Sequence, residues 1–147
     1  MRADRYLRPD WFTQNIFNRV VHWLTRLGVS VYGSRILAVP GRKSGQWRTT
    51  PVNLLEFRGG RYLVAPRGVT EWVRNIRASG TGELRLDGRR EPIFVEELSD
   101  AEKPELLRYY LKRWKWEASQ FFEGLDADAP ESEIKRIAPN HPVFRIR

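Results

Sequence analysis

Residues 46–65 read QWRTTPVNLLEFRGGRYLVA, and this stretch predicts a β-hairpin. Apolar and aromatic side chains recur along residues 46–57, which favours one long strand. Arg58-Gly59-Gly60-Arg61 supplies a glycine-containing turn, after which residues 62–65 return as the second strand. Because a tight turn joins antiparallel neighbours, the fold is expected to be built on an antiparallel sheet.

The same pattern continues on both sides of this hairpin. Residues 35–39 predict a strand before it, and residues 82–87 and 89–98 predict a second hairpin that turns at Asp87-Gly88. Many short strands with few helices favour an α+β fold, a small antiparallel β-barrel with flanking helices. A parallel nucleotide-binding sheet is excluded because the helices are too few for its crossover connections.

Helices are predicted at both ends of the chain and between the hairpins. Their ranges are residues 11–27, ending at Gly28; residues 70–78, with Thr70 as N-cap; residues 99–116, capped by Ser99 or Asp100; and residues 131–138. Residues 142–146 predict a final edge strand. With no repeat or linker, residues 1–147 are expected to form one domain, consisting of the helix at 11–27, the barrel at 35–98 and the helical region and edge strand at 99–147.

Composition narrows the functional classes. The 147 residues include no Cys and two His, which excludes disulfides, thiolate nucleophiles and an all-histidine metal centre, so no metal is expected. Twenty-six Lys and Arg against 18 Asp and Glu give a net charge of +8, which favours an anionic partner: nucleic acid, a membrane surface or a small polyanion. No segment is apolar enough to span a membrane and no signal peptide is visible, so a cytoplasmic location is expected.

The loop at residues 41–48, GRKSGQWR, is the densest functional signal. Its glycines allow a tight turn that can expose successive backbone N–H groups to an anion. Positive charge and a hydroxyl come from Arg42, Lys43, Ser44 and Arg48, although the spacing of a P-loop is absent. An anion site is therefore predicted here, with a solvated hairpin loop as the alternative.

A second signal follows the first hairpin at Ala65-Pro66-Arg67-Gly68. Pro and Gly favour an irregular loop that a flat ligand can approach closely. Trp72 and Asn75 come next, three residues apart and therefore on one helix face. On the alternative interpretation, Trp72 belongs to the core and Asn75 caps a helix or is solvated.

Together GRKSGQWRTTPV, YLVAPRG and EWVRNIRA resemble the deazaflavin-dependent nitroreductase family, which uses coenzyme F420. The resemblance covers roughly residues 35–98 and implies a split β-barrel related to the flavin-mononucleotide-binding reductases. It implies that Arg42, Lys43, Ser44, Gly45 and Arg48 hold the phosphate and acidic tail of the cofactor. It further places Ala65, Pro66, Arg67 and Gly68 along the deazaflavin ring, with Trp72 and Asn75 closing the groove. The short loop before Trp72, and Asn53 where some relatives have an aromatic residue, depart from the family near the expected acceptor site.

The implied activity is that of an F420H2-dependent reductase, which transfers a hydride to an electron-poor small molecule such as an enone, a quinone or a nitro compound. Asn53 and Trp114 are candidate acceptor contacts, and Tyr109 and Tyr110 are candidate proton donors, although core packing explains these aromatic residues equally simply. His22 and His141 are interpreted as structural or solvated.

Several alternatives stay open at this stage. The same barrel could use flavin mononucleotide, or it could bind a cofactor or small ligand without catalysis. Nucleic-acid binding is not expected, because no zinc-finger or RNP-like motif is visible and the basic residues are scattered. Aromatic residues beside arginines in the helix at 11–27 raise peripheral membrane contact as an alternative to packing on the barrel. A homodimer is suggested by analogy with related barrels alone.

Overall fold

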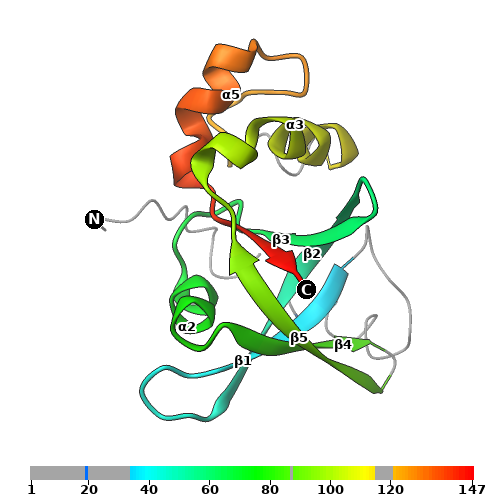
Figure 1. Ribbon diagram of the computed structural model, residues 1–147, viewed down its shortest axis with the longest axis vertical. Coiled ribbons are helices and arrows are strands. Elements are labelled where there is room, and N and C mark those ends of the chain that lie inside the picture. Colours follow the sequence, from blue (N-terminus) through cyan, green and yellow to red (C-terminus); the bar gives the residue numbers. More distant parts are fainter. Residues whose placement is uncertain (1–18, 20–33, 87, 115–120) are drawn as a thin grey trace.

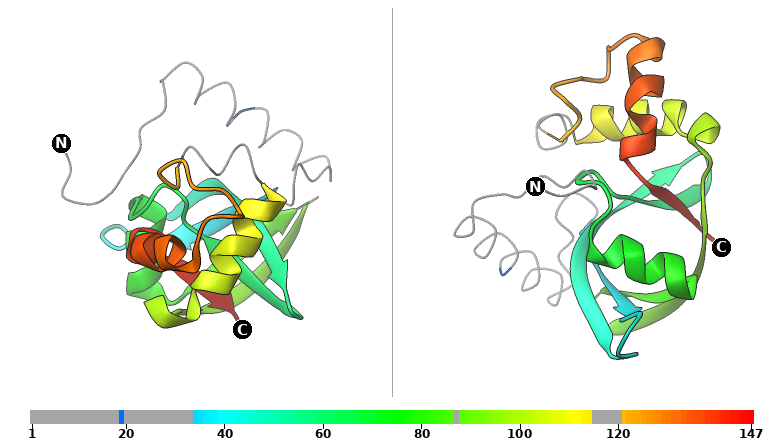
Figure 2. Two further views of the ribbon diagram at one scale, coloured as in Figure 1. Left: turned by 90° about the horizontal axis from the view of Figure 1, so that it is seen from above. Right: turned by 90° about the vertical axis from the view of Figure 1, so that its left-hand side faces the viewer.

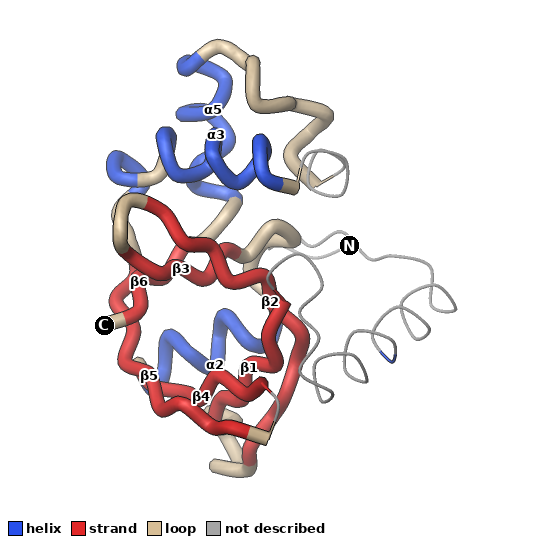
Figure 3. The backbone as a smooth tube through the Cα atoms, turned by 90° about the vertical axis from the view of Figure 1, so that its right-hand side faces the viewer, coloured by secondary structure: helices blue, strands red, loops and turns tan. Residues whose placement is uncertain are grey.

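Six antiparallel strands close into a barrel in which every strand pairs with two neighbours (Figures 1 and 3). The computed structural model describes residue 19 and residues 34–86, 88–114 and 121–147. Around the barrel the order is β1-β2-β3-β6-β5-β4. The strands are β1 (Ser34–Pro40), β2 (Trp47–Phe57), β3 (Gly60–Val64), β4 (Thr81–Leu86), β5 (Arg89–Glu97) and β6 (Val143–Ile146). This confirms the predicted α+β class and the antiparallel barrel.

Both predicted hairpins are present in the barrel. In the first, Leu54 pairs with Leu63 and Phe57 pairs with Gly60. Arg58 and Gly59 form its two-residue turn with φ angles of +50° and +80°. Two consecutive positive φ angles match the right-handed twist of the flanking strands, which is why a glycine is favoured here.

The prediction that residues 142–146 form an edge strand is wrong. β6 lies between β3 and β5, and Phe144 pairs with both Leu63 and Glu97. Val143 and Phe144 point to opposite faces of the sheet, and both are buried. A four-residue strand at the end of the chain does not reveal its partners, because they lie far away in sequence.

Two apolar cores stabilise the fold. One core fills the barrel lumen, which α2 (Glu71–Ser79) closes at one end. Val73 and Ile76 of α2 are fully buried in this core. The other lies between the outer faces of β2, β3 and β6 and the helices α3 (Pro104–Arg113) and α5 (Glu131–Ile137). Figure 2 shows α3 and α5 together above the barrel, well apart from α2. The helices α3 and α5 thus cover one outer face of the barrel, and α2 closes one end of its lumen.

The helix predictions are confirmed in part. Thr70 takes the N-cap position of α2 with an extended backbone, but its side chain makes no capping hydrogen bond. Ser99 forms a capping box with Glu102 at a 3-10 turn (Asp100–Glu102), and α3 begins only at Pro104. A second 3-10 turn (Ala138–Asn140) follows α5.

The predicted helix at 11–27 lies outside the described residues apart from Arg19. Among the residues that the structure describes, no helix is long and apolar enough to cross a membrane.

Close contact between β1 and β4 makes Gly82 sensitive to substitution. A Cβ atom there would lie 2.8 Å from the backbone oxygen of Ala38, and a backbone atom cannot rotate away. We expect Gly82→Ala to lower the free energy of unfolding by about 1–3 kcal/mol, measured by urea denaturation. Gly60→Ala is the matched control, because its Cβ would meet only the end of the Tyr62 side chain at 3.0 Å. Equal stability of the two variants would contradict the close approach.

Candidate functional site

The loop between β1 and β2 is a tight hairpin loop closed by its own backbone. The N–H of Gly41 donates to the carbonyl of Gln46 at 2.8 Å, and the N–H of Gly45 donates to the carbonyl of Gly41 at 2.9 Å. Gly45 has a φ of +77°, a left-handed conformation that suits glycine. Residues 41–46 therefore form a defined turn, which we call the β1–β2 loop.

Arg42 attaches the β1–β2 loop to α2, which lies beside it in Figure 1. Its backbone N–H donates to Oδ1 of Asn75 at 3.1 Å, and its Nη1 donates to the same oxygen at 2.9 Å. Nη1 also pairs with Oε1 of Glu71 at 2.9 Å. Asn75 is only 5% exposed. The structure thus brings two of the predicted site residues together, with Arg42 engaged by protein atoms.

Lys43 and Arg48 carry the unpaired positive charge of this region. Both are exposed, and no carboxylate among the described residues pairs with either. The backbone N–H groups of Lys43 and Ser44 likewise find no acceptor in the described part of the chain. The Ser44 hydroxyl accepts from the N–H of Gln46. Lys43 with two open N–H groups on the loop, and Arg48 at the start of β2, form the kind of donor set that binds phosphate and carboxylate groups.

Because Gly41 has no side chain, its neighbours approach its backbone closely. A Cβ atom at this position would lie 3.1 Å from Oγ of Ser44 and 3.6 Å from Nε of Arg48. Arg48 therefore lies against the loop rather than apart from it, although it belongs to the start of β2. The residues present fit an anionic group at this loop.

The second predicted segment leads directly into α2, at the same end of the barrel. The N–H of Ala65 donates to the carbonyl of Pro142, and the N–H of Gly68 donates to the carbonyl of Ala65 at 3.2 Å. Gly68 has a φ of +90°, so the segment turns sharply after β3. Ala65 and Gly68 are buried, whereas Pro66 and Arg67 remain partly exposed. Residues 65–68 thus lie between the strand end and the helix that holds the β1–β2 loop.

Trp72 is predicted either to close the cofactor groove or to belong to the core. Its ring packs on Phe144 with the centroids 5.8 Å apart, and it contributes to the lumen core while staying partly exposed. Packing against Phe144 explains its presence without a ligand. Its predicted contact with a cofactor stays a prediction.

The candidate acceptor residues form a separate group beneath α3. Nδ2 of Asn53 donates to the hydroxyl of Tyr110 at 3.2 Å. Tyr110 is 1% exposed and packs on Trp114, with ring centroids 4.8 Å apart. Asn53 follows Trp47 by six residues along β2, a distance of about 20 Å. This group is therefore remote from the β1–β2 loop, and its contact with an acceptor stays a prediction.

Tyr109 and His141 lie in the same helical layer. Tyr109 is partly buried and packs on Phe57 at a centroid distance of 5.2 Å. His141 is fully buried, with its ring stacked on Phe122 at 4.0 Å. These contacts favour a packing role for the histidine.

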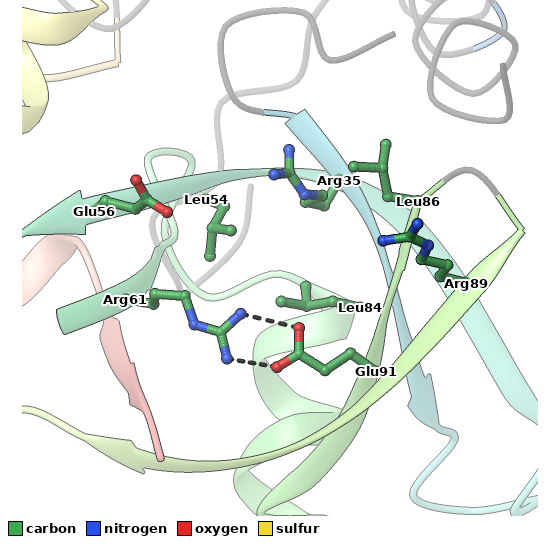
Figure 4. A pocket seen from close by; sticks show the side chains of 8 residues that line it. All are labelled: Arg35, Leu54, Glu56, Arg61, Leu84, Leu86, Arg89 and Glu91. Carbon is green, nitrogen blue, oxygen red and sulfur yellow. Dashed lines mark hydrogen bonds and ion pairs between the residues drawn. The ribbon is translucent and has the colours of Figure 1, made fainter. Parts of the chain in front are cut away.

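At the opposite end of β1 from the β1–β2 loop, the barrel opens into a cavity of about 360 Å³ (Figure 4). Arg61 and Glu91 bridge it through two hydrogen bonds of 2.9 and 2.6 Å. The hydrogen bond from Arg61 lowers the pKa of Glu91 below its ordinary value, and Glu91 in turn raises the pKa of Arg61. Because these two charges satisfy each other, this ion pair offers less to an anion than the unpaired cations of the loop. The lining residues are Arg35, Leu54, Glu56, Arg61, Leu84, Leu86, Arg89 and Glu91.

Sequence reasoning missed Glu71. Its carboxylate balances Arg42 at 2.9 Å and also meets Arg74 at 3.4 Å. Glu71 and Asn75 are four residues apart and so share a face of α2. Only the position of the β1–β2 loop shows that this face holds Arg42.

The chain is thus a closed antiparallel barrel with a basic loop held against a helix. The model of the F420H(2)-dependent quinone reductase family matches residues 16–120, and the chain belongs to this family. Its cofactor is coenzyme F420, as predicted, and its general activity is that of an F420-dependent reductase. The finer nitroreductase label of the sequence resemblance is not confirmed.

Solved structures share the fold at low sequence identity. A structure described as an F420-H2 dependent reductase matches with a TM-score of 0.56 and 18% identity, covering 78% of this chain and 94% of that one. One described as a domain-swapped dimer matches with a TM-score of 0.58 and 19% identity, covering 94% and 98%. HutZ, a heme storage protein from Vibrio cholerae, matches with a TM-score of 0.53 and 8% identity, covering 79% and 81%. No curated protein matches the sequence significantly.

Proposed function

We propose that this F420-dependent reductase uses a quinone as its electron acceptor and binds its cofactor at the β1–β2 loop. The observation that carries the binding site is a set of donors without a partner among the described residues: the side chain of Lys43 and the N–H groups of Lys43 and Ser44 on the loop, and the side chain of Arg48 at the start of β2. The family supports the choice of a quinone.

The charges of the loop suit the anionic parts of coenzyme F420, which carries a phosphodiester and a polyglutamate tail. The planar guanidinium of Arg48 can donate two parallel hydrogen bonds to a phosphate or carboxylate. Lys43 adds a point charge, and the two N–H groups add directional donors. These groups would bind the anionic end of the cofactor, and another part of the chain would contact its ring.

We assign the ring to residues 65–68. Pro66 and Arg67 are partly exposed there, and the turn at Gly68 lets the backbone approach a flat ligand. When bound, the reduced deazaflavin supplies a hydride from ring carbon 5. The part of the protein is to orient the acceptor against that carbon and to exclude water.

Asn53 is proposed as the acceptor contact because it is partly exposed, whereas Trp114 is 3% exposed and packs on Tyr110, which suits it less to this role. The proton that completes the reduction is proposed to come from solvent or from Tyr109, which is partly exposed. Tyr110 is less suited to this role, because it is buried and its hydroxyl is already bonded to Asn53.

Binding and turnover test this proposal in one series. Purified protein is titrated with F420 and with flavin mononucleotide while tryptophan fluorescence is followed, and oxidation of F420H2 is then measured with menadione, a nitroaromatic compound and an enone. We expect F420 to bind at least about tenfold more tightly than flavin mononucleotide, since a lone phosphate uses fewer cations, and menadione to be reduced fastest. Preference for flavin mononucleotide would contradict the proposal, and F420 binding without turnover would favour a non-catalytic binding module.

A homodimer is a further part of the proposal. One structure with the same fold is described as a domain-swapped dimer. Light scattering coupled to size-exclusion chromatography would give twice the 17.3 kDa chain mass for a dimer. A monomeric mass at micromolar concentration would contradict it.

A further inference from the structure

Asn75 is hydrogen-bonded to the β1–β2 loop at residue 42, through a single oxygen atom. Its Oδ1 accepts both the backbone N–H of Arg42 at 3.1 Å and the Nη1 of Arg42 at 2.9 Å. The amide is 5% exposed and sits on α2, between the buried Ile76 and the partly exposed Arg74. We propose that Asn75 is a positioning residue, which acts through Arg42 to preset the β1–β2 loop for the anionic end of the cofactor. This inference rests on the proposed binding site.

The position of Arg42 in the chain gives this contact its effect. Arg42 directly precedes Lys43 and Ser44, whose N–H groups are the open donors of the loop. Because both the main chain and the side chain of Arg42 are held, the backbone dihedral angles that orient the N–H groups of Lys43 and Ser44 are restricted. A loop that is ordered before binding does not lose that freedom on binding, and its affinity is correspondingly higher.

Arg42 itself is then a structural cation rather than a ligand of the cofactor. Its Nη1 is shared between Asn75 and Glu71, and Glu71 supplies the neutralising charge. Glu71 is 73% exposed in its side chain and is shared with Arg74, so its contribution is expected to be smaller than that of the buried amide. The expected order of effects is Asn75 first and Glu71 second.

The role of the acceptor oxygen can be separated from that of the amide as a whole. Asn75→Asp keeps an acceptor oxygen at this position, removes the NH2 group and adds a negative charge, whereas Asn75→Leu keeps the volume and removes the acceptor. We expect Asn75→Leu to raise the Kd for F420 and the KM for F420H2 by about tenfold or more. Its kcat at saturating F420H2 should stay within about twofold, because the loop binds and does not react. The added charge of Asn75→Asp faces an anionic ligand and weakens binding by repulsion, so this variant tests the acceptor oxygen through exchange of the loop and not through the Kd.

Hydrogen–deuterium exchange of the cofactor-free protein provides a readout that does not depend on activity. The peptide containing residues 41–46 should exchange faster in Asn75→Leu than in the unsubstituted protein, and at the normal rate in Asn75→Asp. Arg77→Gln is the matched control, since Arg77 lies on the same helix but is exposed and pairs with Glu97 at 2.7 Å. It should change neither Kd nor exchange of the loop.

Clear outcomes would overturn the inference. If folded Asn75→Leu binds F420 within twofold of the original Kd, Asn75 does not position the loop. Equally fast exchange of residues 41–46 in Asn75→Leu and Asn75→Asp would show that the acceptor oxygen does not order the loop. If Asn75→Leu does not fold, Arg42→Ala takes its place, and unchanged exchange of the loop would overturn the inference. If the unsubstituted protein fails to bind F420, the proposed site falls, while the exchange data still decide whether Asn75 orders the loop.

Discussion

Replacing Arg48 by alanine is expected to raise the Kd for F420 by about ten- to hundredfold. Hydrogen bonds to charged groups contribute about 1.5–3 kcal/mol each, and 1.4 kcal/mol corresponds to a factor of ten. Arg48 has no carboxylate partner among the described residues, so its removal disrupts no ion pair within that part of the chain. It lies against the loop, close to Gly41 and Ser44. The measurement is a fluorescence titration of the purified variant with F420.

Arg77→Ala is the control that separates a local contact from net charge. It removes the same charge from an exposed position on α2, where Arg77 pairs with Glu97. A change in net charge alone would weaken F420 binding similarly in both variants, with a strong dependence on salt concentration. Equal losses in Arg48→Ala and Arg77→Ala would therefore exclude the β1–β2 loop as the specific site.

Phe144→Ala is expected to cause the largest loss of stability, about 3–5 kcal/mol in the free energy of unfolding. Phe144 is 1% exposed and belongs to the strand that closes the barrel between β3 and β5. Its ring also supports Trp72, so the substitution leaves a cavity between the lumen and α2. Urea denaturation followed by tryptophan fluorescence measures the change.

Phe94 provides the matched comparison for that experiment. It has the same side chain and lies on the neighbouring strand β5, but it is 64% exposed. We expect Phe94→Ala to change the free energy of unfolding by less than about 1 kcal/mol. Similar values for the two variants would mean that β6 is not an integral strand of the barrel.

Much of the fold could be predicted because its signals are local. The hairpin turns at Arg58-Gly59 and before Arg89 depend on residues next to each other in the chain, and so does the helical spacing in α2. The edge assignment of β6 failed for the opposite reason. Its partners are set by barrel closure, which joins Phe144 to Leu63, far away in sequence.

The basic loop could also be found from sequence, and so could its resemblance to enzymes that use F420. Sequence reasoning missed that the basic residues of this region differ in their partners. It treated Arg42, Lys43 and Arg48 as equivalent ligands, whereas the structure engages Arg42 with Asn75 and Glu71 and leaves the other two unpaired within the described residues. The neutralising Glu71 has no signal of its own in the sequence.

By itself the sequence determined the strands, the turns, the excess of positive charge and the loop that gathers it. These properties follow from the backbone preferences and charges of neighbouring residues. Only the tertiary structure decided which strand closes the barrel and which arginine is neutralised. The two ends of the Arg42–Asn75 contact are 33 residues apart, and they meet because α2 closes the same end of the barrel at which the β1–β2 loop emerges.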